Sequence, residues 1–263
     1  ETRNVTTANV RYGITSRLAT TAEWQRREVK FSAPAFRAGE LTENEVGLGL
    51  RYGLPSMLVV GVSVRTSKTD QPRHTEAGGA GSGVFLANKS DRRDIDLTAD
   101  WQASGFSSIS ARLSYGKQDH SLPQVPDFKG ATGSVSWSYR PSDKTGLNLQ
   151  FMRDTGTSTS FMQYEGNATP LETYAGRLTN FLSASLDYDL TAKIRLNASA
   201  RRVKANLDGG ATDETTRGAS LGASYAYSRA ISFNCSVEHE KLDTGLSDVS
   251  NRTVNCAGQL AIR

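Results

Sequence analysis

The sequence predicts an all-β protein, and specifically a transmembrane, antiparallel, up-and-down β-barrel. Three observations lead to this fold class: apolar and polar residues alternate, the alternating segments are long, and short turns alternate with long polar loops. The alternation is clear in residues 92–118, where apolar residues occupy every second position on both sides of a turn near Gly105. Successive side chains of a strand point to opposite faces, so each such segment has one apolar face and one polar face.

About thirteen segments of roughly 9–12 residues repeat the pattern, which is the length that a tilted strand needs to cross a bilayer. In chain order, their apolar positions are Ala8, Val10, Tyr12 and Ile14; a weaker pair, Ala22 and Trp24; Val46, Leu48, Leu50 and Tyr52; Leu58, Val60, Val62 and Val64; Ile95, Leu97, Ala99 and Trp101; Ile109, Ala111, Leu113 and Tyr115; Ala131, Gly133, Val135, Trp137 and Tyr139; Leu147, Leu149 and Phe151; Leu182, Ala184, Leu186 and Tyr188; Ile194, Leu196, Ala198 and Ala200; Ala219, Leu221, Ala223, Tyr225 and Tyr227; Ile231, Phe233, Cys235 and Val237; and Val254, Cys256, Gly258, Leu260 and Ile262.

The connections between these segments are of two kinds. Short turns rich in Gly, Pro, Ser and Asp occur in YGITSRL, YGLPSML, WQASGFSS, YRPSDKTG, YDLTAKI and YSRAISF. Long polar loops are expected between them, for example at residues 67–91 and 155–174. Short turns at one end and long loops at the other are typical of an outer-membrane barrel, in which the short turns are periplasmic.

Aromatic residues on the apolar face precede the short turns: Tyr12, Tyr52, Trp101, Trp137, Tyr139, Tyr188, Tyr225 and Tyr227. Rings gathered at one end of successive hairpins predict the aromatic girdle of a membrane interface. The alternative is that aromatic residues are simply common in strands.

Soluble β-sandwiches and propellers also alternate. Sandwich strands average about 5–6 residues, which is much shorter than these segments, and the blade signatures of propellers are missing. We therefore expect a single membrane domain over residues 1–263. The first and last segments run in the same direction, so an even-numbered antiparallel barrel would need at least one further strand upstream of residue 1 and would have about 14–18 strands in all. The alternative is a parallel closure.

Composition excludes several function classes. The net charge of +4 is spread along the chain, without the concentrated basic stripe of a nucleic-acid-binding protein. The three histidines, His74, His120 and His239, have no Ser or acid partner at a fixed spacing, and we expect the first two to lie in loops. Asp-Thr-Gly in residues 154–156 is a weak signal, because aspartic proteases hold this tripeptide in an apolar cradle, whereas here it is expected at the top of a strand. We expect neither enzymatic activity nor a cofactor.

Three stretches carry a resemblance to a known family: ADWQASGFSSISARLSYGKQDH, GATGSVSWSYRPSDKTGLNLQFMRDTG and NCAGQLAIR. They resemble the EpsL-type outer-membrane β-barrel proteins of exosortase/PEP-CTERM-associated exopolysaccharide biosynthesis. The resemblance covers about residues 90–160 and the C-terminal strand well, and the remainder by pattern. It implies a barrel that carries polysaccharide across the outer membrane, and it brings no catalytic residues.

Charged residues of the polar parity are candidates to line a hydrated pore, because charge on the lipid face at mid-membrane costs a few kcal/mol. The candidates are Arg11, Arg51, Arg65, Asp96, Asp100, Arg112, Arg140, Asp154, Asp187, Arg195, Arg201 and Glu238, with Glu240 beside them. Mixed charges and hydroxyl groups suit a conduit for a sugar polymer. The alternative for each residue is an ion pair that holds the barrel together.

A second set of cations has the parity of the apolar face but lies toward the long-loop end. Arg153, Arg202, Lys204 and Arg217 are its main members, together with Arg26, Lys68, Lys117 and Lys241. At that height they could contact the phosphates of lipopolysaccharide. The alternative is that the strands extend above the membrane and carry solvated charges.

Cys235 and Cys256 fall on the last two strands, on the same face, and symmetrically about a loop near residues 245–246. This placement predicts a cross-strand disulfide in the oxidising periplasm. The alternative is a pair of small apolar residues.

These expectations describe a bacterial outer-membrane β-barrel that exports an exopolysaccharide passively through a polar lumen. Its expected partners are outer-membrane lipid, lipopolysaccharide, the polysaccharide and periplasmic export proteins. Two other functions stay open: a structural sheath around a cytochrome or lipoprotein, and a general diffusion porin.

Overall fold

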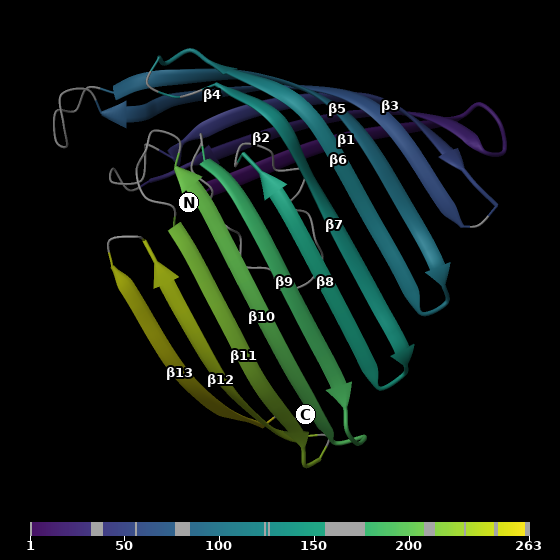
Figure 1. Ribbon diagram of the computed structural model, residues 1–263, viewed down its shortest axis with the longest axis vertical. Coiled ribbons are helices and arrows are strands. Elements are labelled where there is room, and N and C mark those ends of the chain that lie inside the picture. The colour runs from purple at the N-terminus through teal and green to yellow at the C-terminus, as the bar shows by residue number, and fades with distance from the viewer. Residues whose placement is uncertain are drawn as a thin grey trace. The chain divides into compact units, whose positions relative to one another are not determined.

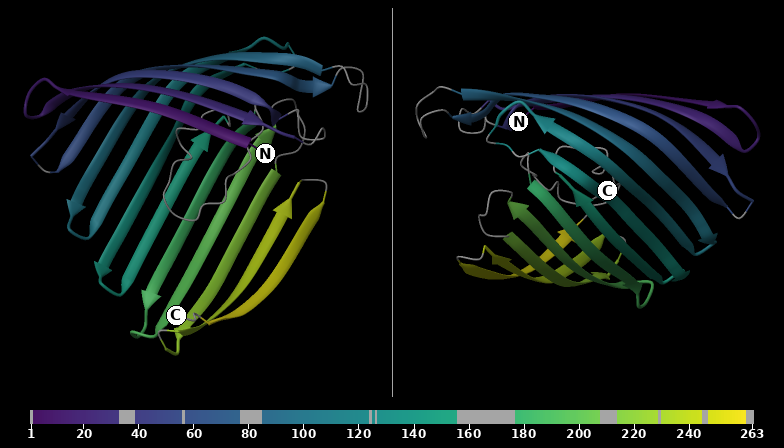
Figure 2. Two further views of the ribbon diagram at one scale, coloured as in Figure 1. Left: turned by 180° about the vertical axis from the view of Figure 1, so that it is seen from behind. Right: turned by 45° about the horizontal axis from the view of Figure 1, so that its top comes forward.

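The computed structural model describes residues 2–32, 39–55, 57–76, 85–123, 125, 127–155, 177–207, 214–228, 230–244 and 247–260. Thirteen antiparallel strands are hydrogen-bonded in sequence order. They are β1 (Thr2–Gly13), β2 (Leu18–Lys30), β3 (Leu41–Gly53), β4 (Leu58–Glu76), β5 (Phe85–Ser104), β6 (Ser107–His120), β7 (Phe128–Ser142), β8 (Thr145–Asp154), β9 (Arg177–Asp189), β10 (Ile194–Leu207), β11 (Glu214–Ala226), β12 (Ile231–Asp243) and β13 (Asp248–Leu260). Figures 1 and 2 show consecutive strands side by side with alternating directions.

The up-and-down arrangement confirms the predicted fold class. In the part of the chain that the structure describes, no helix is long and apolar enough to cross a membrane. The strands have 10 to 20 residues, and all except β1 and β8 are longer than expected from the sequence. The weak pattern at Ala22 and Trp24 belongs to a complete strand, β2.

The expected loop at residues 67–91 is wrong for most of its length. β4 continues to Glu76 and β5 begins at Phe85, so two long strands occupy most of this segment. Exposed and buried side chains alternate along the strands in this segment. Polar residues occupy both faces, however, so the sequence shows no alternation of apolar and polar residues and the strands could not be predicted from hydropathy. The expected loop at residues 155–174 lies, after Thr155, outside the described residues.

Short turns close one end of the hairpins, with two to four residues between consecutive strands. Hydroxyl side chains stabilise several of them by accepting backbone N–H bonds. Thr15 Oγ1 accepts from Leu18, Thr191 Oγ1 from Ile194 and Ser228 Oγ from Ile231, at 3.0–3.1 Å. This contact is the local reason that Ser and Thr recur in these turns.

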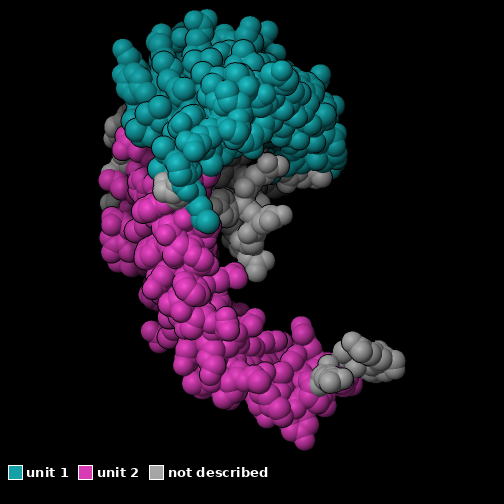
Figure 3. Space-filling view, turned by 90° about the vertical axis from the view of Figure 1, so that its right-hand side faces the viewer, with its two compact units in different colours: residues 1–99, 112–133, 155–176 teal, residues 100–111, 134–154, 177–263 magenta. Residues whose placement is uncertain are grey.

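The described residues fall into two compact units (Figure 3). Unit 1 comprises residues 1–99, 112–133 and 155–176, and unit 2 comprises residues 100–111, 134–154 and 177–263. Unit 1 contains β1–β4 and parts of β5–β7. Unit 2 contains the hairpin tip of β5 and β6, most of β7, and β8–β13.

In unit 2 the register aligns apolar residues in a row across β8–β13. The row consists of Leu147, Leu186, Ala198, Leu221, Val237 and Val254. Four of its larger members, Leu186, Leu221, Val237 and Val254, are exposed, with Leu221 at 67% and Val254 at 65%. We call the face that carries this row, and its continuation on the other strands, the apolar face, and the opposite one the polar face.

Burial is inverted relative to a water-soluble protein. Among the described residues, the buried apolar side chains are Ala19, Val29 and Ala205, whereas sixteen polar residues are buried. Large apolar side chains such as Leu97 and Val135 are exposed instead. Apolar outside and polar inside is the arrangement of a sheet whose outer surface meets lipid.

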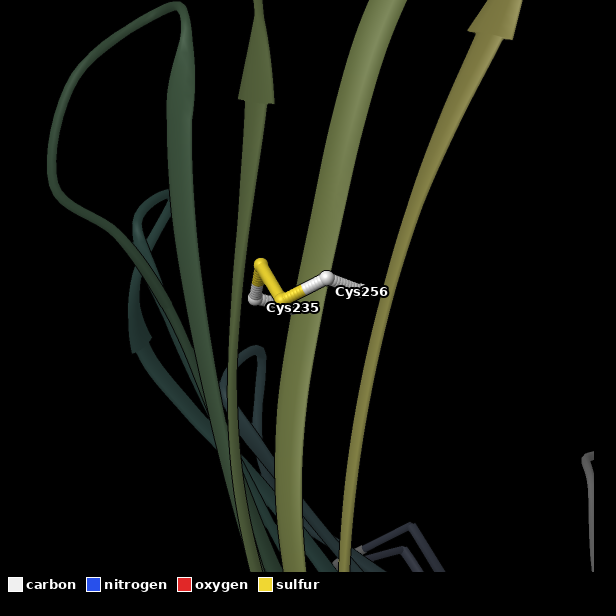
Figure 4. Close-up of a disulfide and its surroundings, with 2 residues drawn as sticks. All are labelled: Cys235 and Cys256. Atoms are coloured by element: carbon white, nitrogen blue, oxygen red, sulfur yellow. A yellow bond between two sulfur atoms is a disulfide. The ribbon is translucent and has the colours of Figure 1, made fainter.

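Cys235 and Cys256 are directly opposite each other on β12 and β13 and form a disulfide, with a Cα–Cα distance of 4.1 Å (Figure 4). The bond joins the last two strands on the apolar face. The intervening residues 245–246 lie outside the described residues.

Candidate functional site: the polar face

The polar face of unit 1 is buried along β4–β6, and the strand alternation is the cause. In β5 the side chains from Asn88 to Asp96 are buried at every second position. Asp96 is 1% exposed, whereas its neighbours Ile95 and Leu97 are 57% and 54% exposed on the apolar face. Charged groups therefore meet one another on a single face, away from solvent.

Arg65 of β4 is the centre of this face. Its guanidinium lies 3.2 Å from Glu45 Oε2 of β3, 3.2 Å from Asp94 Oδ2 and 3.4 Å from Asp96 Oδ2 of β5. Arg112 of β6 donates to the same Oδ2 of Asp96 at 2.7 Å. Each buried charge thus has partners of opposite sign, which is the condition for keeping charge in a low-dielectric interior.

The network extends to both sides of Arg65. On β2 and β3, Arg27 and Glu43 form a pair at 3.0 Å, with side chains 12% and 2% exposed. Toward the long-loop end, Arg92 Nε lies 2.8 Å from Asp94 Oδ2. We call Arg27, Glu43, Glu45, Arg65, Arg92, Asp94, Asp96 and Arg112 the ion-pair network.

Arg92 also binds two hydroxyl groups. Its Nη1 donates to Thr155 Oγ1 at 2.7 Å and its Nη2 donates to Thr132 Oγ1 at 3.1 Å. Thr155 in turn donates to Gln118 Oε1 at 3.3 Å. Thr155 directly follows β8, so this contact fixes the first residue after that strand.

The polar face of unit 2 is more open. Arg201 lies 3.3 Å from Glu238 and 3.2 Å from Glu240, and these side chains are about 40% exposed. Arg195 pairs with Asp189 at 2.6 Å near the short-turn end. Hydroxyl groups lie between these charges, as in the hydrogen bond between Ser199 and Ser220 at 2.7 Å.

The twelve residues predicted to line a pore have the parity of the polar face, but their surroundings differ. Arg65, Asp96 and Arg112 are brought together in the ion-pair network, and Asp154 is buried at the end of β8. Arg51 is half-buried on β3. The other seven are exposed or half-exposed: Arg11, Asp100, Arg140, Asp187, Arg195, Arg201 and Glu238. Of these, Arg201 and Glu238 meet in an ion pair, whereas Arg195 pairs with Asp189, which the sequence analysis did not select.

Sequence reasoning missed five members of the network: Arg27, Glu43, Glu45, Arg92 and Asp94. Arg92 and Asp94 share the parity of Asp96 in the segment RRDIDL, so the same alternation could have found them. The contacts of Arg92 with Thr132 and Thr155 depend on the packing of distant strands and have no signal in the sequence.

The histidines have surroundings that differ from the expected loops. His74 lies on β4 and His120 ends β6, so placing them in loops was wrong. Asn88 Nδ2 lies 3.1 Å from His120 Nδ1, and the backbone N–H of His120 donates to Asp127 Oδ1 at 2.8 Å. His239 lies on the apolar face of β12, opposite Ala219 and Arg252.

Comparisons with known proteins agree with this arrangement. Residues 111–258, more than half of the chain, match the family described as "Putative beta-barrel porin 2". No curated protein matches the chain significantly.

Solved outer-membrane proteins share the fold. The chain matched in the FpvAI–pyocin S2 complex has a TM-score of 0.56 at 9% identity, over 99% of this chain and 44% of that one. The FrpB iron transporter of Neisseria meningitidis has a TM-score of 0.53 at 10% identity, over 90% of this chain and 43% of that one. The outer membrane channel DcaP of Acinetobacter baumannii has a TM-score of 0.50 at 11% identity, over 97% of this chain and 83% of that one. The chain thus spans less than half the length of the first two.

The exposed apolar face, the charged polar face and the family match lead to one conclusion. In a porin the apolar face meets lipid and the polar face lies inside the barrel. The chain belongs to the β-barrel porin family that its residues 111–258 match, and it has the fold of a bacterial outer-membrane β-barrel protein.

Proposed function

We propose that the chain forms the wall of a channel that exports an exopolysaccharide across the outer membrane. The observation that carries the proposal is the polar face of unit 2, which presents hydroxyl and amide groups to its surroundings. Asn197 and Ser199 of β10, Asn234 of β12 and Asn255 of β13 are exposed there. Such groups exchange hydrogen bonds with sugar hydroxyls and with water, so a hydrated polymer would bind weakly and could slide.

The contrast between the two polar faces supports assigning the sugar contacts to unit 2. In the ion-pair network of unit 1 the charged groups bind one another and are shielded from solvent, as Arg65 is at 6% exposure. Their charges are already paired within the protein. The resemblance of residues 90–160 and of the C-terminal strand to polysaccharide-export barrels supports the same class of cargo.

A deletion strain tests the cargo. We expect loss of surface polysaccharide and its retention in the periplasm, and restoration of export by the wild-type gene. Normal amounts of surface polysaccharide in the deletion strain would overturn the proposal. Liposomes containing the purified protein should admit small solutes poorly, whereas indiscriminate passage would favour a general diffusion porin, and co-purification with a cytochrome would favour a sheath.

A matched pair of variants tests whether the polar face of unit 2 contacts the polysaccharide. Ser199→Val with Ser220→Val removes two hydroxyl groups from the polar face, and Ala200→Val with Ala219→Val adds similar bulk on the apolar face of the same strands. We expect the serine variant to fold, to reach the outer membrane and to export less polysaccharide, and the alanine variant to export normally. Equal export by both variants would show that these hydroxyl groups do not contact the cargo.

A further inference from the structure

Cations lie directly opposite one another on the apolar face of unit 2. The register pairs Arg202 of β10 with Arg217 of β11, and Arg217 with Lys241 of β12. All three have the parity of the apolar residues on their strands. Like charges directly opposite each other destabilise a sheet, so this row is explained best by an anion that binds it from outside the chain.

The protein itself does little to neutralise the row. Among the described residues, neither Arg202 nor Arg217 takes part in an ion pair, and both are exposed. Two carboxylates of β12, Glu238 and Glu240, have the opposite parity and bind Arg201 on the polar face. A third, Asp243, has the parity of the row and lies two residues beyond Lys241, opposite Asp248. Lys241 is paired with Asp248 at 2.7 Å, so the two arginines carry most of the uncompensated charge.

Two further arginines extend the cationic surface. Arg252 of β13 is opposite His239, two residues below Lys241 along β12, and Arg153 of β8 is opposite Asn180, two residues above Leu182. Both are exposed and, within the described part of the chain, in no ion pair. We call Arg153, Arg202, Arg217 and Arg252 the outer arginines.

The distance of Arg202 and Arg217 from the short-turn end of the strands indicates which part of the membrane they contact. Arg217 is nine residues from Ala226, the end of β11 beside the short turn, and Arg202 is eight residues from Ile194, the start of β10. At about 3.3 Å per residue and a tilt of about 40°, they lie about 20–23 Å above that end. The apolar band of an outer-membrane barrel is about 25 Å tall, so both guanidinium groups lie close to its outer boundary.

We propose that the outer arginines bind the phosphate groups of lipid A in the lipopolysaccharide of the outer leaflet. A planar guanidinium donates two parallel hydrogen bonds to one phosphate. Two arginines on neighbouring strands, both close to the outer boundary of the apolar band and facing lipid, fit a doubly phosphorylated headgroup whose acyl chains lie against the row of Leu186, Leu221 and Val237 below. The inference is independent of the cargo, since it concerns the opposite face of the sheet.

Native mass spectrometry of the purified chain in detergent tests the proposal, with doubly phosphorylated lipid A and its dephosphorylated form as probes. We expect the wild type to bind the phosphorylated form at least about tenfold more tightly, because charge-assisted hydrogen bonds are lost with the phosphates. Equal binding of the two forms would overturn the proposal. It would show that the arginines are solvated charges above the membrane.

Variants assign the binding to the arginines. Arg202→Gln with Arg217→Gln should reduce the affinity for phosphorylated lipid A about tenfold or more, and leave the affinity for the dephosphorylated form unchanged. Lys144→Gln with Lys193→Gln, in short turns at the other end, changes the net charge equally and should have no effect. Folding is checked by the heat-dependent shift on gels. If the glutamine variant does not fold, Arg202→Lys with Arg217→Lys replaces it, which keeps the charge and removes the planar guanidinium groups. Undiminished binding of phosphorylated lipid A by whichever variant folds would contradict the assignment of binding to these arginines.

Discussion

At the scale of single residues, the ion-pair network shows how a polar interior is stabilised without an apolar core. Asp96 accepts hydrogen bonds from Arg65 and Arg112 through oxygens that are almost inaccessible to solvent. The desolvation of these three groups is offset by their mutual attraction as long as every partner is present. Replacing Asp96 with a neutral residue therefore removes a negative charge that both Arg65 and Arg112 need as a partner.

We expect Asp96→Asn to lower the free energy of unfolding by about 3 kcal/mol, because breaking a buried ion pair leaves uncompensated charge. Urea titration of the protein in lipid vesicles measures the change. Asp189→Asn is the matched control, since its pair with Arg195 is exposed and should contribute far less. Equal effects of the two substitutions would show that the interior of unit 1 is as hydrated as the protein surface.

His120 adds a pH dependence at the long-loop end of unit 1. The apolar residues of β6 end at Tyr115, so His120 lies beyond the membrane-crossing part. Burial lowers the pKa of His120, the charge of nearby His74 lowers it further, and the carboxylates of Asp127 and Asp119 oppose this effect. The neutral ring can accept a hydrogen bond from the Asn88 amide, and protonation would abolish that acceptor.

Because the pKa of His120 is lower in the folded protein than in the unfolded chain, the neutral ring stabilises the fold above about pH 6.5, and this contribution is lost as the pH falls below that value. We expect hydrogen exchange of residues 117–121, corrected for intrinsic rates, to be faster at about pH 5.5 than at about pH 7.5. His120→Gln keeps an acceptor for Asn88 and should remove the pH dependence. The same pH dependence in that variant would assign the effect to another group.

At the scale of strands, the close approach of β6 to β7 explains why residue 133 of β7 is a glycine. A Cβ added to Gly133 would lie 2.5 Å from the carbonyl oxygen of Arg112 on β6 and 3.4 Å from the Cα of Leu113. Both contacts are with backbone, which cannot rotate away. A Cβ at Gly146 of β8, in contrast, would meet nothing within 4 Å.

We expect Gly133→Ala to reduce the free energy of unfolding by about 1–3 kcal/mol, which is the range for overpacking a tight contact. Gly146→Ala should leave it unchanged or raise it slightly, since alanine loses less backbone entropy on folding. Unfolding of both variants in vesicles, compared with the wild type, measures the difference. A stable Gly133→Ala variant would mean that β6 and β7 can separate at no cost.

The disulfide belongs to the same scale, because it crosslinks two strands. Cys235 and Cys256 are 21 residues apart in the sequence, and closing a loop of that size in the unfolded chain is worth about 3 kcal/mol. We expect Cys235→Ala with Cys256→Ala to lower the free energy of unfolding by up to this amount. The same variant should speed hydrogen exchange in β13 more than in β10. A free-thiol assay on unreduced wild-type protein should find no reactive cysteine, and two reactive thiols would contradict the bond.

At the scale of the whole molecule, the two-residue alternation was sufficient to predict the fold class. Each strand position fixes its face, so Leu97, Val135 and Leu186 could be assigned to the apolar face from the sequence. The alternation could not predict which polar residues are buried, because Asp96 and Asp100 have the same parity and differ in what packs around them. The alternation also failed to predict the parts of β4 and β5 that lie beyond the apolar band. Both faces are polar there, so apolar and polar residues do not alternate in the sequence.

The orientation of the two faces is the property on which the proposed channel function depends, and neighbouring residues of β11 test it. Leu221 is on the apolar face, and Ser220 is on the polar face, where it binds Ser199. An arginine placed on the lipid face near mid-membrane costs about 2–4 kcal/mol, whereas the polar face can hydrate it. We therefore expect Leu221→Arg to lower the free energy of unfolding in vesicles by about that amount and Ser220→Arg to lower it much less. The opposite order, with Ser220→Arg the more damaging change, would mean that Leu221 faces water and that the sheet does not have its apolar face toward lipid.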